Sequence, residues 1–139
     1  MSKLTYKEND SIDFAQIKNL YESVGWRNYT NDMDKLISGI NNSSFIVSVY
    51  EDDLLVGLLR VISDEYTIAY IQDILVLSQY QNKGIGKKLI AMFLEKYSHV
   101  RQKILLTDNE QSLKRFYTTS GFRKVDELML TCYMYEEKM

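Results

Sequence analysis

Residues 74–90 decide the fold of this chain, and they read Ile74-Leu75-Val76-Leu77-Ser78-Gln79-Tyr80-Gln81-Asn82-Lys83-Gly84-Ile85-Gly86-Lys87-Lys88-Leu89-Ile90. The apolar start predicts a strand, a turn follows it, and an amphipathic helix continues beyond the two glycines. The predicted buried side of this helix is formed by residues four apart and their neighbours: Ile85, Leu89, Phe93, Tyr97, Ile90 and Leu94. The stretch therefore predicts a strand–loop–helix unit.

The loop of this unit has the chemistry of an anion site. Gly84 and Gly86 have no Cβ, so the backbone can turn tightly there and a ligand can approach closely. The first N–H groups of a helix lack partners within it, and the helix dipole is positive at that end, which favours phosphate. Two glycines alone also fit an ordinary tight turn, but Gln-x-x-Gly-x-Gly after an apolar strand is more specific. The string matches neither the dinucleotide-binding Gly-x-Gly-x-x-Gly nor the P-loop.

Length and charge limit the classes of protein to consider. The 139 residues suit a single domain spanning 1–139. A net charge of −2 gives no basic surplus for binding nucleic acid. With one cysteine and one histidine, neither a disulfide framework nor a Cys/His metal site is expected, and Cys132 is predicted to lie in the core. No leader or membrane-length apolar run is visible, so a cytoplasmic protein without membrane contact is expected.

The remaining pattern predicts a mixed α/β (α+β) fold with a mostly antiparallel central sheet flanked by helices. Strands are predicted at residues 4–7, 45–50, 54–62, 66–77, 103–107, 122–125 and 129–135. Helices are predicted at about 17–24, 33–40, 85–98 and 110–119, with residues 26–31 as a loop and Asp32 as a helix cap. The strand at 54–62 is apolar on both alternations, which is typical of a central strand. The strand at 103–107 follows a crossover helix, so it should run parallel to the strand before that helix.

Two motifs give the chain a family resemblance. The first is Gln81-x-x-Gly84-x-Gly86, and the second is Phe116-Tyr117-Thr118-Thr119-Ser120-Gly121-Phe122. With this order of elements, the chain resembles the GNAT superfamily of N-acetyltransferases. The segment Tyr21–Thr30 also resembles a bacterial subgroup that carries a similar stretch.

The resemblance implies acetyl-coenzyme A as the acetyl donor. The backbone amides around the loop would hold its pyrophosphate, at Gln81, Asn82, Lys83, Gly84, Ile85, Gly86 and Lys87. The strand before the loop would separate from its parallel neighbour, so that free backbone groups of Leu75, Val76 and Leu77 pair with the pantetheine arm. The N–H of Val76, or that of a neighbour, would polarise the thioester carbonyl.

Tyr117 has two interpretations. Its spacing from Leu113 and Phe116 fits a core tyrosine, whereas the resemblance implies that its hydroxyl protonates the leaving coenzyme A thiolate. A tyrosine with an ordinary pKa near ~10 is protonated at neutral pH and can act as an acid. The family often places a cofactor-contacting Asn seven residues before this tyrosine. That position is Glu110 here, and Asn109, one residue earlier, is the residue expected to contact the cofactor instead.

Asp73 is a carboxylate inside an apolar strand. It could be a structural partner of backbone N–H groups or of Arg60, a catalytic base, or an anchor for a cationic amine. A proton relayed through water would replace a side-chain base.

Strict alternation along the strand places Tyr70 and Gln72 on the face of Ile74 and Val76, opposite Asp73. Family strands often bulge near this point, which would change these faces. Tyr70 stands where some family members carry a catalytic Glu, and it cannot serve as an equivalent base. Together with Gln72, it is expected to contact the acceptor.

Trp26 and Tyr29 are expected to form a wall of the acceptor pocket, or else to pack in the core. These inferences predict an acetyl-coenzyme A-dependent N-acetyltransferase that acts on a primary amine of a small molecule or peptide, by direct attack in a ternary complex. The alternative is a non-catalytic coenzyme A-binding or regulatory module on the same fold. The acceptor and the oligomeric state, monomer or homodimer, stay open.

Overall fold

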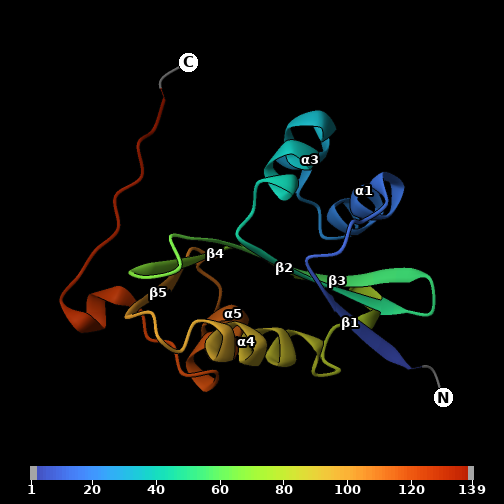
Figure 1. Cartoon of the computed structure of the whole chain (residues 1–139). Helices are drawn as coiled ribbons and strands as arrows, with labels where there is room; N and C mark the ends of the chain where they lie inside the picture. Colours follow the sequence, from blue (N-terminus) through green and yellow to red (C-terminus); the bar gives the residue numbers. More distant parts are fainter. Residues whose placement is uncertain (1–2, 138–139) are drawn as a thin grey trace. The chain divides into compact units, whose positions relative to one another are not determined.

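The computed structural model describes residues 3–137 of the chain (Figure 1). The chain divides into two compact units, Met1–Leu106 and Thr107–Met139, and each is described by itself.

The first unit is built on a five-stranded sheet in the order β1-β2-β3-β4-β5. Its strands are β1 (Leu4–Glu8), β2 (Phe45–Glu51), β3 (Leu54–Ser63), β4 (Ile68–Val76) and β5 (Gln102–Leu105). The first four strands pair antiparallel, and β5 runs parallel to β4. The predicted mixed, mostly antiparallel sheet and its parallel crossover are therefore confirmed.

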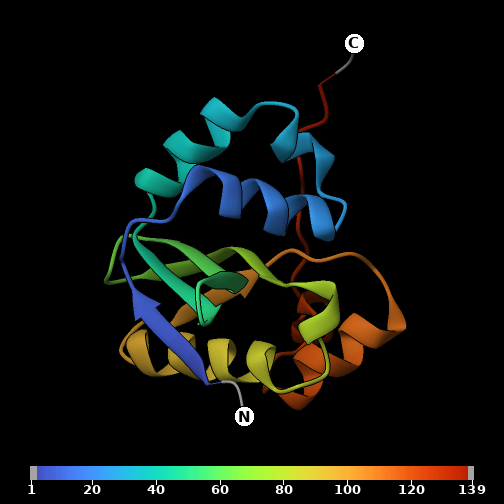
Figure 2. The same ribbon diagram turned by 90° about the vertical axis from the view of Figure 1, so that its right-hand side faces the viewer.

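Helices cover both faces of this sheet. They are α1 (Phe14–Ser23), α2 (Arg27–Thr30), α3 (Met33–Asn41) and α4 (Ile85–Lys96). Figures 1 and 2 show α1 and α3 over one face and α4 under the other. The Asp32 carboxylate accepts a hydrogen bond from the Lys35 N–H at 3.2 Å, which confirms the predicted cap of α3. The loop predicted at residues 26–31 is wrong in part, because α2 forms one helical turn there. That stretch contains no Gly or Pro to prevent it.

The core lies on both sides of β3, which is buried from Leu55 to Val61 as its two apolar alternations predicted. On the α4 side, Gly57 leaves room for the helix. A Cβ added there would lie 3.2 Å from Cγ2 of Ile85 and 3.3 Å from Cγ2 of Val49. Since Ile85 is the first residue of α4, the bare backbone at Gly57 sets how closely the start of this helix approaches the sheet.

A β-bulge interrupts the pairing of β3 with β4. Arg60 is opposite Asp73, but Val61 is opposite Ile71, so Gln72 is an extra residue in β4. The register therefore places Tyr70 on the same face as Asp73, the face that α1 and α3 cover. The prediction from strict alternation, which put these two residues on opposite faces, is wrong because a bulge shifts the period by one residue.

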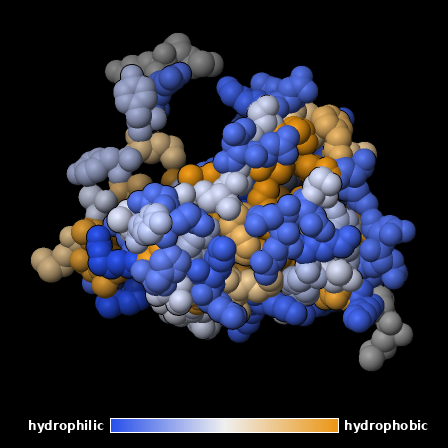
Figure 3. Space-filling view, in the orientation of Figure 1, coloured by the Kyte–Doolittle hydropathy of each residue, from blue (hydrophilic) through white to orange (hydrophobic). Residues whose placement is uncertain are grey.

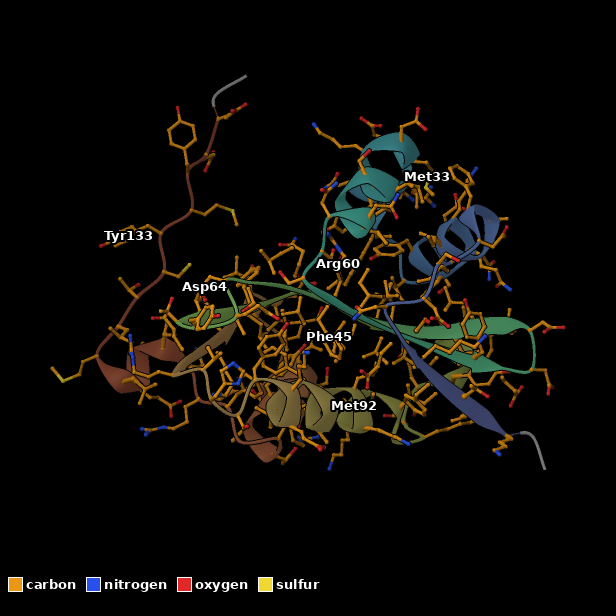
Figure 4. All side chains as sticks on the ribbon, viewed as in Figure 1. Met33, Phe45, Arg60, Asp64, Met92 and Tyr133 are labelled. Atoms are coloured by element: carbon orange, nitrogen blue, oxygen red, sulfur yellow. The ribbon has the colours of Figure 1, made fainter. Side chains whose placement is uncertain are left out.

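The second unit contains α5 (Gln111–Thr119) and a 3₁₀ turn, η2 (Val125–Leu128). The strands predicted at 122–125 and 129–135 are wrong, since residues 122–124 and 130–137 belong to no helix or strand, η2 begins at Val125 and residue 129 is a turn. The prediction of a buried Cys132 is wrong for the same reason, and this side chain is exposed. A strand needs a neighbour to pair with, and residues 107–137 provide none. Figure 4 shows the labelled Tyr133 side chain projecting from this extended segment.

Within residues 3–137, no helix combines the length and apolar character that crossing a membrane requires. The same residues contain no group of three or more His, Cys, Asp or Glu side chains arranged to hold a metal ion.

We expect Gly57→Val to destabilise the first unit, because the added methyl groups would overlap Ile85 and Val49. Overpacking of this kind costs roughly 1–3 kcal/mol of the free energy of unfolding. Urea unfolding measures it, with Ile62→Val, a shortening of a side chain 43% exposed on the same strand, as the control. Equal stability of the two variants would contradict the close packing of α4 on β3.

Candidate active site

The start of α4 offers unpaired N–H groups. Gly84, the residue before the helix, is left-handed with φ of 88°, and no side chain caps the helix. The first helical hydrogen bond runs from the Lys88 N–H to the Gly84 carbonyl, at 3.0 Å. The N–H groups of residues 85–87 therefore have no acceptor within the helix. The first turn carries no acidic residue. This geometry suits an anion such as a phosphate group.

The strand that leads into this loop has an open edge. Pairing between β4 and β5 ends at Ile71 and Leu105. On the other side of β4, the Leu77 N–H donates to the Val56 carbonyl at 2.8 Å. In an antiparallel ladder the backbone groups of successive residues point to opposite edges, so those of Val76 point to the open side.

The backbone predictions for this strand are therefore right only in part. The prediction of a free N–H at Leu77 is wrong, because this N–H donates a hydrogen bond to β3. By the same alternation, Leu75 also turns its backbone groups to β3, where it pairs with Leu58. Ile74 shares the open edge with Val76, and the sequence reasoning missed it. Ile74 is identified by the alternation of backbone groups along β4, counted from the observed hydrogen bond of Leu77.

Gln81 links the open edge to the loop. Its side-chain Nε2 donates to the Val76 carbonyl at 3.0 Å, and its backbone N–H donates to the Ser78 carbonyl at 3.4 Å. The side-chain NH₂ group and the backbone N–H of Gln81 thus both donate hydrogen bonds within the chain. Val76 is left with its N–H as the group it can offer to a ligand.

Two of the three lysines near the loop lie over aromatic rings. The Lys83 ammonium lies 5.3 Å from the centre of the Tyr80 ring, and the Lys88 ammonium lies 4.1 Å from that of Tyr6. The Tyr80 hydroxyl in turn bonds the Glu51 carboxylate. Lys87 is exposed in the first turn of α4. These positive side chains belong to the loop and the first turn of α4, and their charge favours a negatively charged ligand.

A buried ion pair lies on the sheet face that α1 covers. Arg60 Nε lies 2.8 Å from Asp73 Oδ2, with the two side chains 7% and 2% exposed. Tyr21 donates its hydroxyl to the same oxygen at 2.8 Å, and Tyr29 donates to Oδ1 at 2.9 Å. Figure 4 shows Arg60 between the sheet and the helices above it. Asp73 therefore has the Arg60 partner that one of its sequence interpretations gave it, together with two tyrosine donors.

The proton affinities in this network follow from burial and charge. Burial alone would lower the pKa of Arg60. The charge of Asp73 and its hydrogen bond with Arg60 outweigh burial, so the pKa is raised. Burial, and after it the Asp73 charge, raise the pKa of Tyr21 well above its ordinary value. Burial also raises the pKa of Tyr29, against the opposing hydrogen bond from Gln72. Both tyrosines therefore stay protonated at neutral pH and donate hydrogen bonds to the carboxylate.

Three of the residues predicted to contact the acetyl acceptor lie together here. Gln72, the bulge residue, donates from Nε2 to the Tyr29 hydroxyl at 2.9 Å. The rings of Trp26 and Tyr29 are 6.2 Å apart. An open hollow of about 270 Å³ lies over the turn, lined by residues 25–29. The fourth predicted residue, Tyr70, is half-buried on the same sheet face.

In the second unit, Tyr117 lies on α5 with its ring 5.0 Å from that of Phe116 and 6.0 Å from that of Phe122. Burial raises the pKa of its hydroxyl, while a hydrogen bond with Thr107 acts in the opposite direction. The hydroxyl is therefore protonated at neutral pH, as an acid must be. Asn109 is exposed two residues before α5 begins.

A comparison with protein families identifies the class to which this fold and site belong. Residues 27–130 match the family described as the acetyltransferase (GNAT) domain. The chain belongs to the GNAT family of acetyltransferases, as the two sequence motifs predicted. Its class of activity is N-acetyl transfer.

Individual relatives agree with this assignment. The chain is 28% identical, over 120 residues, to the uncharacterized N-acetyltransferase ycf52 of Pyropia yezoensis, an alignment that covers 84% of this chain and 68% of that protein. The GNAT-family acetyltransferase SP0256 of Streptococcus pneumoniae superposes with a TM-score of 0.86 at 25% identity, over 99% of this chain and 100% of that one. The aminoglycoside N-acetyltransferase AAC(6')-Iy, in complex with CoA, shares the fold alone. It has a TM-score of 0.68 at 12% identity, over 99% of this chain and 96% of that one.

We expect strong coupling between Arg60 and Asp73. Replacing either one by Leu leaves the other charge buried without its opposite charge, which costs roughly 3–5 kcal/mol of the free energy of unfolding. The double variant should lose much less than the two single losses together, because both charges are gone. Urea unfolding of the four proteins measures the coupling. The exposed pair Arg123 and Glu127, 3.6 Å apart, is the control and should couple by about 0–1 kcal/mol. A similar small value for Arg60 and Asp73 would contradict the buried ion pair.

Proposed function

We propose that this chain transfers the acetyl group of acetyl-coenzyme A to a primary amine of a small molecule or peptide, by direct attack within a ternary complex. The observation that carries the proposal is the open edge at Val76, a few residues before the unpaired amides of α4. A strand edge pairs with an extended amide chain, and a helix start binds phosphate. Coenzyme A carries both groups, in its pantetheine arm and its pyrophosphate.

The pyrophosphate would bind to the loop and to the first turn of α4. The groups proposed to hold it are the amides of residues 82–87 and the ammonium groups of Lys83 and Lys87. Gln81, whose amides are engaged with Ser78 and Val76, would keep the loop against the strand rather than contact phosphate. The pantetheine arm would lie along the open edge at Ile74 and Val76. The complex of AAC(6')-Iy with CoA, on the same fold, supports coenzyme A as the ligand.

Acetyl-coenzyme A supplies an activated thioester when bound. The Val76 N–H would donate a hydrogen bond to the carbonyl oxygen, where negative charge develops. The nitrogen of a neutral amine forms a bond to the carbonyl carbon, and the carbon–sulfur bond breaks. The Tyr117 hydroxyl, the role that the family resemblance assigns, gives its proton to the departing sulfur. The proton left on the amide nitrogen passes to water.

Asp73 is proposed as a positioning residue rather than as the base. Its carboxylate accepts from Tyr21, Tyr29 and Arg60 and is 2% exposed, so taking a proton from the amine would mean leaving the Arg60 ion pair. Through the Tyr29 hydroxyl it would fix the ring that walls the acceptor pocket with Trp26. Water is the remaining acceptor for the amine proton.

A thiol-release assay with a panel of acceptors tests the activity itself. Polyamines, arylalkylamines, amino sugars, amino acids and peptides cover the classes of primary amine. Release that depends on an acceptor supports the proposal. Tight binding of coenzyme A with no release for any acceptor would favour the non-catalytic module instead.

Gly84→Val is expected to weaken coenzyme A binding at least ~10-fold. Its φ of 88° is costly for a β-branched residue, so the loop amides would move from their positions. Gly25→Val is the matched control, because Gly25 has a φ of 77° and, like Gly84, no atom within 4 Å of an added Cβ. Calorimetric titration of coenzyme A into both variants, with thermal unfolding alongside, gives the comparison. Equal affinities in folded variants would reject the loop as the pyrophosphate site.

Tyr117→Phe should lower kcat by roughly 10²–10⁴-fold if the hydroxyl is the general acid. Coenzyme A affinity and the thermal midpoint should change little, because the ring and its packing are kept. The control is Tyr66→Phe, since the Tyr66 side chain is 80% exposed. A near-normal kcat for Tyr117→Phe would remove this residue from the mechanism.

The pH profile gives a second measurement of the same residue. Burial raises the pKa of Tyr117, so the acid form persists above pH ~10, where an ordinary tyrosine ionises. The wild-type kcat should therefore fall only at a pH above that value, and the fall should be absent from the residual activity of Tyr117→Phe.

A further inference from the structure

The Asp73 carboxylate is closed off from an incoming amine. Its oxygens accept hydrogen bonds from Arg60 Nε at 2.8 Å, from Tyr21 at 2.8 Å and from Tyr29 at 2.9 Å. The helices over this sheet face bury apolar side chains, namely Ile17 and Leu20 of α1 and Leu36 and Ile40 of α3. Figure 3 shows hydrophobic residues between these two helices. Of the three partners Tyr29 alone is half-buried rather than buried, so an amine could pass a proton to this carboxylate only through the Tyr29 hydroxyl.

The Tyr29 hydroxyl, however, is fully engaged. It donates its one hydrogen to Asp73 Oδ1, and it accepts from Gln72 Nε2 at 2.9 Å and from Arg60 Nη2 at 3.4 Å. A hydroxyl has one hydrogen and two lone pairs, so these three bonds fill it. A proton passed on to Asp73 would also leave the Arg60 charge buried beside a neutral acid. This network therefore keeps its protons in place and supplies no base.

The same bonds fix how the Gln72 amide is turned. Because the Tyr29 hydrogen is committed to Asp73, Gln72 can only donate to that hydroxyl, which turns Nε2 toward Tyr29. The carbonyl oxygen Oε1 then lies on the other side of the amide group. Gln72 is exposed and follows Ile71, the last residue of β4 that pairs with β5. Where the open edge begins, the chain thus presents an oxygen that accepts a hydrogen bond and does not take the proton.

The hollow over residues 25–29 is poorly suited to a cation. Its five lining residues include no carboxylate, and the charged one among them is Arg27, which is exposed. The Arg60 guanidinium already lies 5.9 Å from the centre of the Tyr29 ring, so a second cation over this ring would be repelled. Tyr70, half-buried on the sheet face of Asp73, offers a phenol and no negative charge. These surroundings disfavour an ammonium ion and accept a neutral amine.

We propose that this protein takes its acceptor only as the neutral amine, with an N–H donated to Gln72 Oε1, and that weakly basic primary amines such as the α-amino group of a peptide are its preferred acceptors. This role rests on the proposed acetyl transfer. The lone pair of the amine nitrogen forms the bond to the carbonyl carbon, and the electron pair of the broken carbon–sulfur bond leaves on sulfur, which takes the Tyr117 proton. The extra proton on nitrogen goes to water, and Tyr117 regains its proton from water.

The basicity of the two common peptide amines gives the size of the effect. An α-amino group has a pKa near ~7.7–8.0 and a lysine side chain one near ~10.4, so at neutral pH the neutral fraction of the former is roughly 200–400-fold larger. Glycyl-lysinamide carries both amines in one molecule. With acetyl-coenzyme A and the full chain at neutral pH, it should be acetylated at least ~10-fold more on the α-nitrogen than on the ε-nitrogen. Mass spectrometry of the product measures the ratio, and equal amounts or an excess of the ε-product would overturn the proposal.

The pH dependence of kcat/KM separates a neutral acceptor from a base in the protein. For an alkyl amine such as Nα-acetyl-lysinamide, kcat/KM should rise about tenfold per pH unit from pH ~7 toward the amine's own pKa near ~10.4. For glycinamide the rise should end near pH ~8. A base in the protein would react with the ammonium form, and kcat/KM for the alkyl amine would then be level over that range. A level profile would overturn this proposal alone, whereas no acetylation of any amine would reject the proposed function and this role with it.

Gln72→Met tests the contact at Oε1. The change keeps the length of the side chain and removes the oxygen, so kcat/KM for the acceptor should fall roughly 2–13-fold, the loss of one neutral hydrogen bond. Coenzyme A affinity and the thermal midpoint should be unchanged, because the side chain is exposed. Gln102→Met, at an exposed glutamine on β5, is the matched control. Equal kcat/KM in the two variants would overturn the proposal.

Gln72→Glu gives a readout that a role in packing alone would not move. The carboxylate puts a base where the amide oxygen was, so the kcat/KM profile of the alkyl amine should become level between pH ~7 and ~10. The Gln102→Glu variant should keep the slope of the wild type. If Gln72→Glu also keeps that slope, Gln72 does not contact the amine and the proposal is wrong.

Discussion

The early end of the pairing between β4 and β5 is the constraint on which the proposed site depends. The two strands run together only as far as Ile71 and Leu105, and the rest of β4 keeps one edge unpaired. An exposed edge is a template for pairing with another extended chain, and proteins usually cover or blunt it. Here the edge leads directly, through one short turn, to a helix start whose amides are also unpaired. These two incomplete hydrogen-bonding surfaces follow one another along the chain, and together they make up the proposed site for a ligand with an amide arm and a phosphate group.

The buried network around Asp73 ties α1 and α2 to strands β3 and β4. The bulge at Gln72 turns two successive side chains to the face of α1, and both of them bond to the Tyr29 hydroxyl. Arg60 ties the same carboxylate to the central strand. A buried charge pair is stable only when its remaining bonding groups are satisfied, and the tyrosines satisfy them here. The network thus joins Tyr29, in the proposed acceptor pocket, to the strand that carries Val76.

The sequence was sufficient to predict the family, the order of the strands and longer helices through α5, and the strand–loop–helix unit at residues 74–90, because these depend on local patterns of apolar residues and glycines. It could not identify the bulge at Gln72, which depends on pairing with a strand elsewhere in the chain. For the same reason it could not show that the Leu77 N–H donates a hydrogen bond to the Val56 carbonyl, whereas the Val76 N–H faces the open edge. The alternating residues 129–135 predicted a strand, but a strand forms only where a partner edge exists, and composition does not reveal that edge.

Amide hydrogen exchange, resolved by NMR at Val76 and Leu77 with and without coenzyme A, tests the central claim most directly. Leu77 donates to Val56 within the sheet, so its amide should exchange slowly in both states. The Val76 amide should exchange quickly in the free protein and slow down by at least ~10-fold when coenzyme A pairs with the open edge. A Val76 amide that is already protected, or one that coenzyme A leaves unchanged while it binds, would contradict the account.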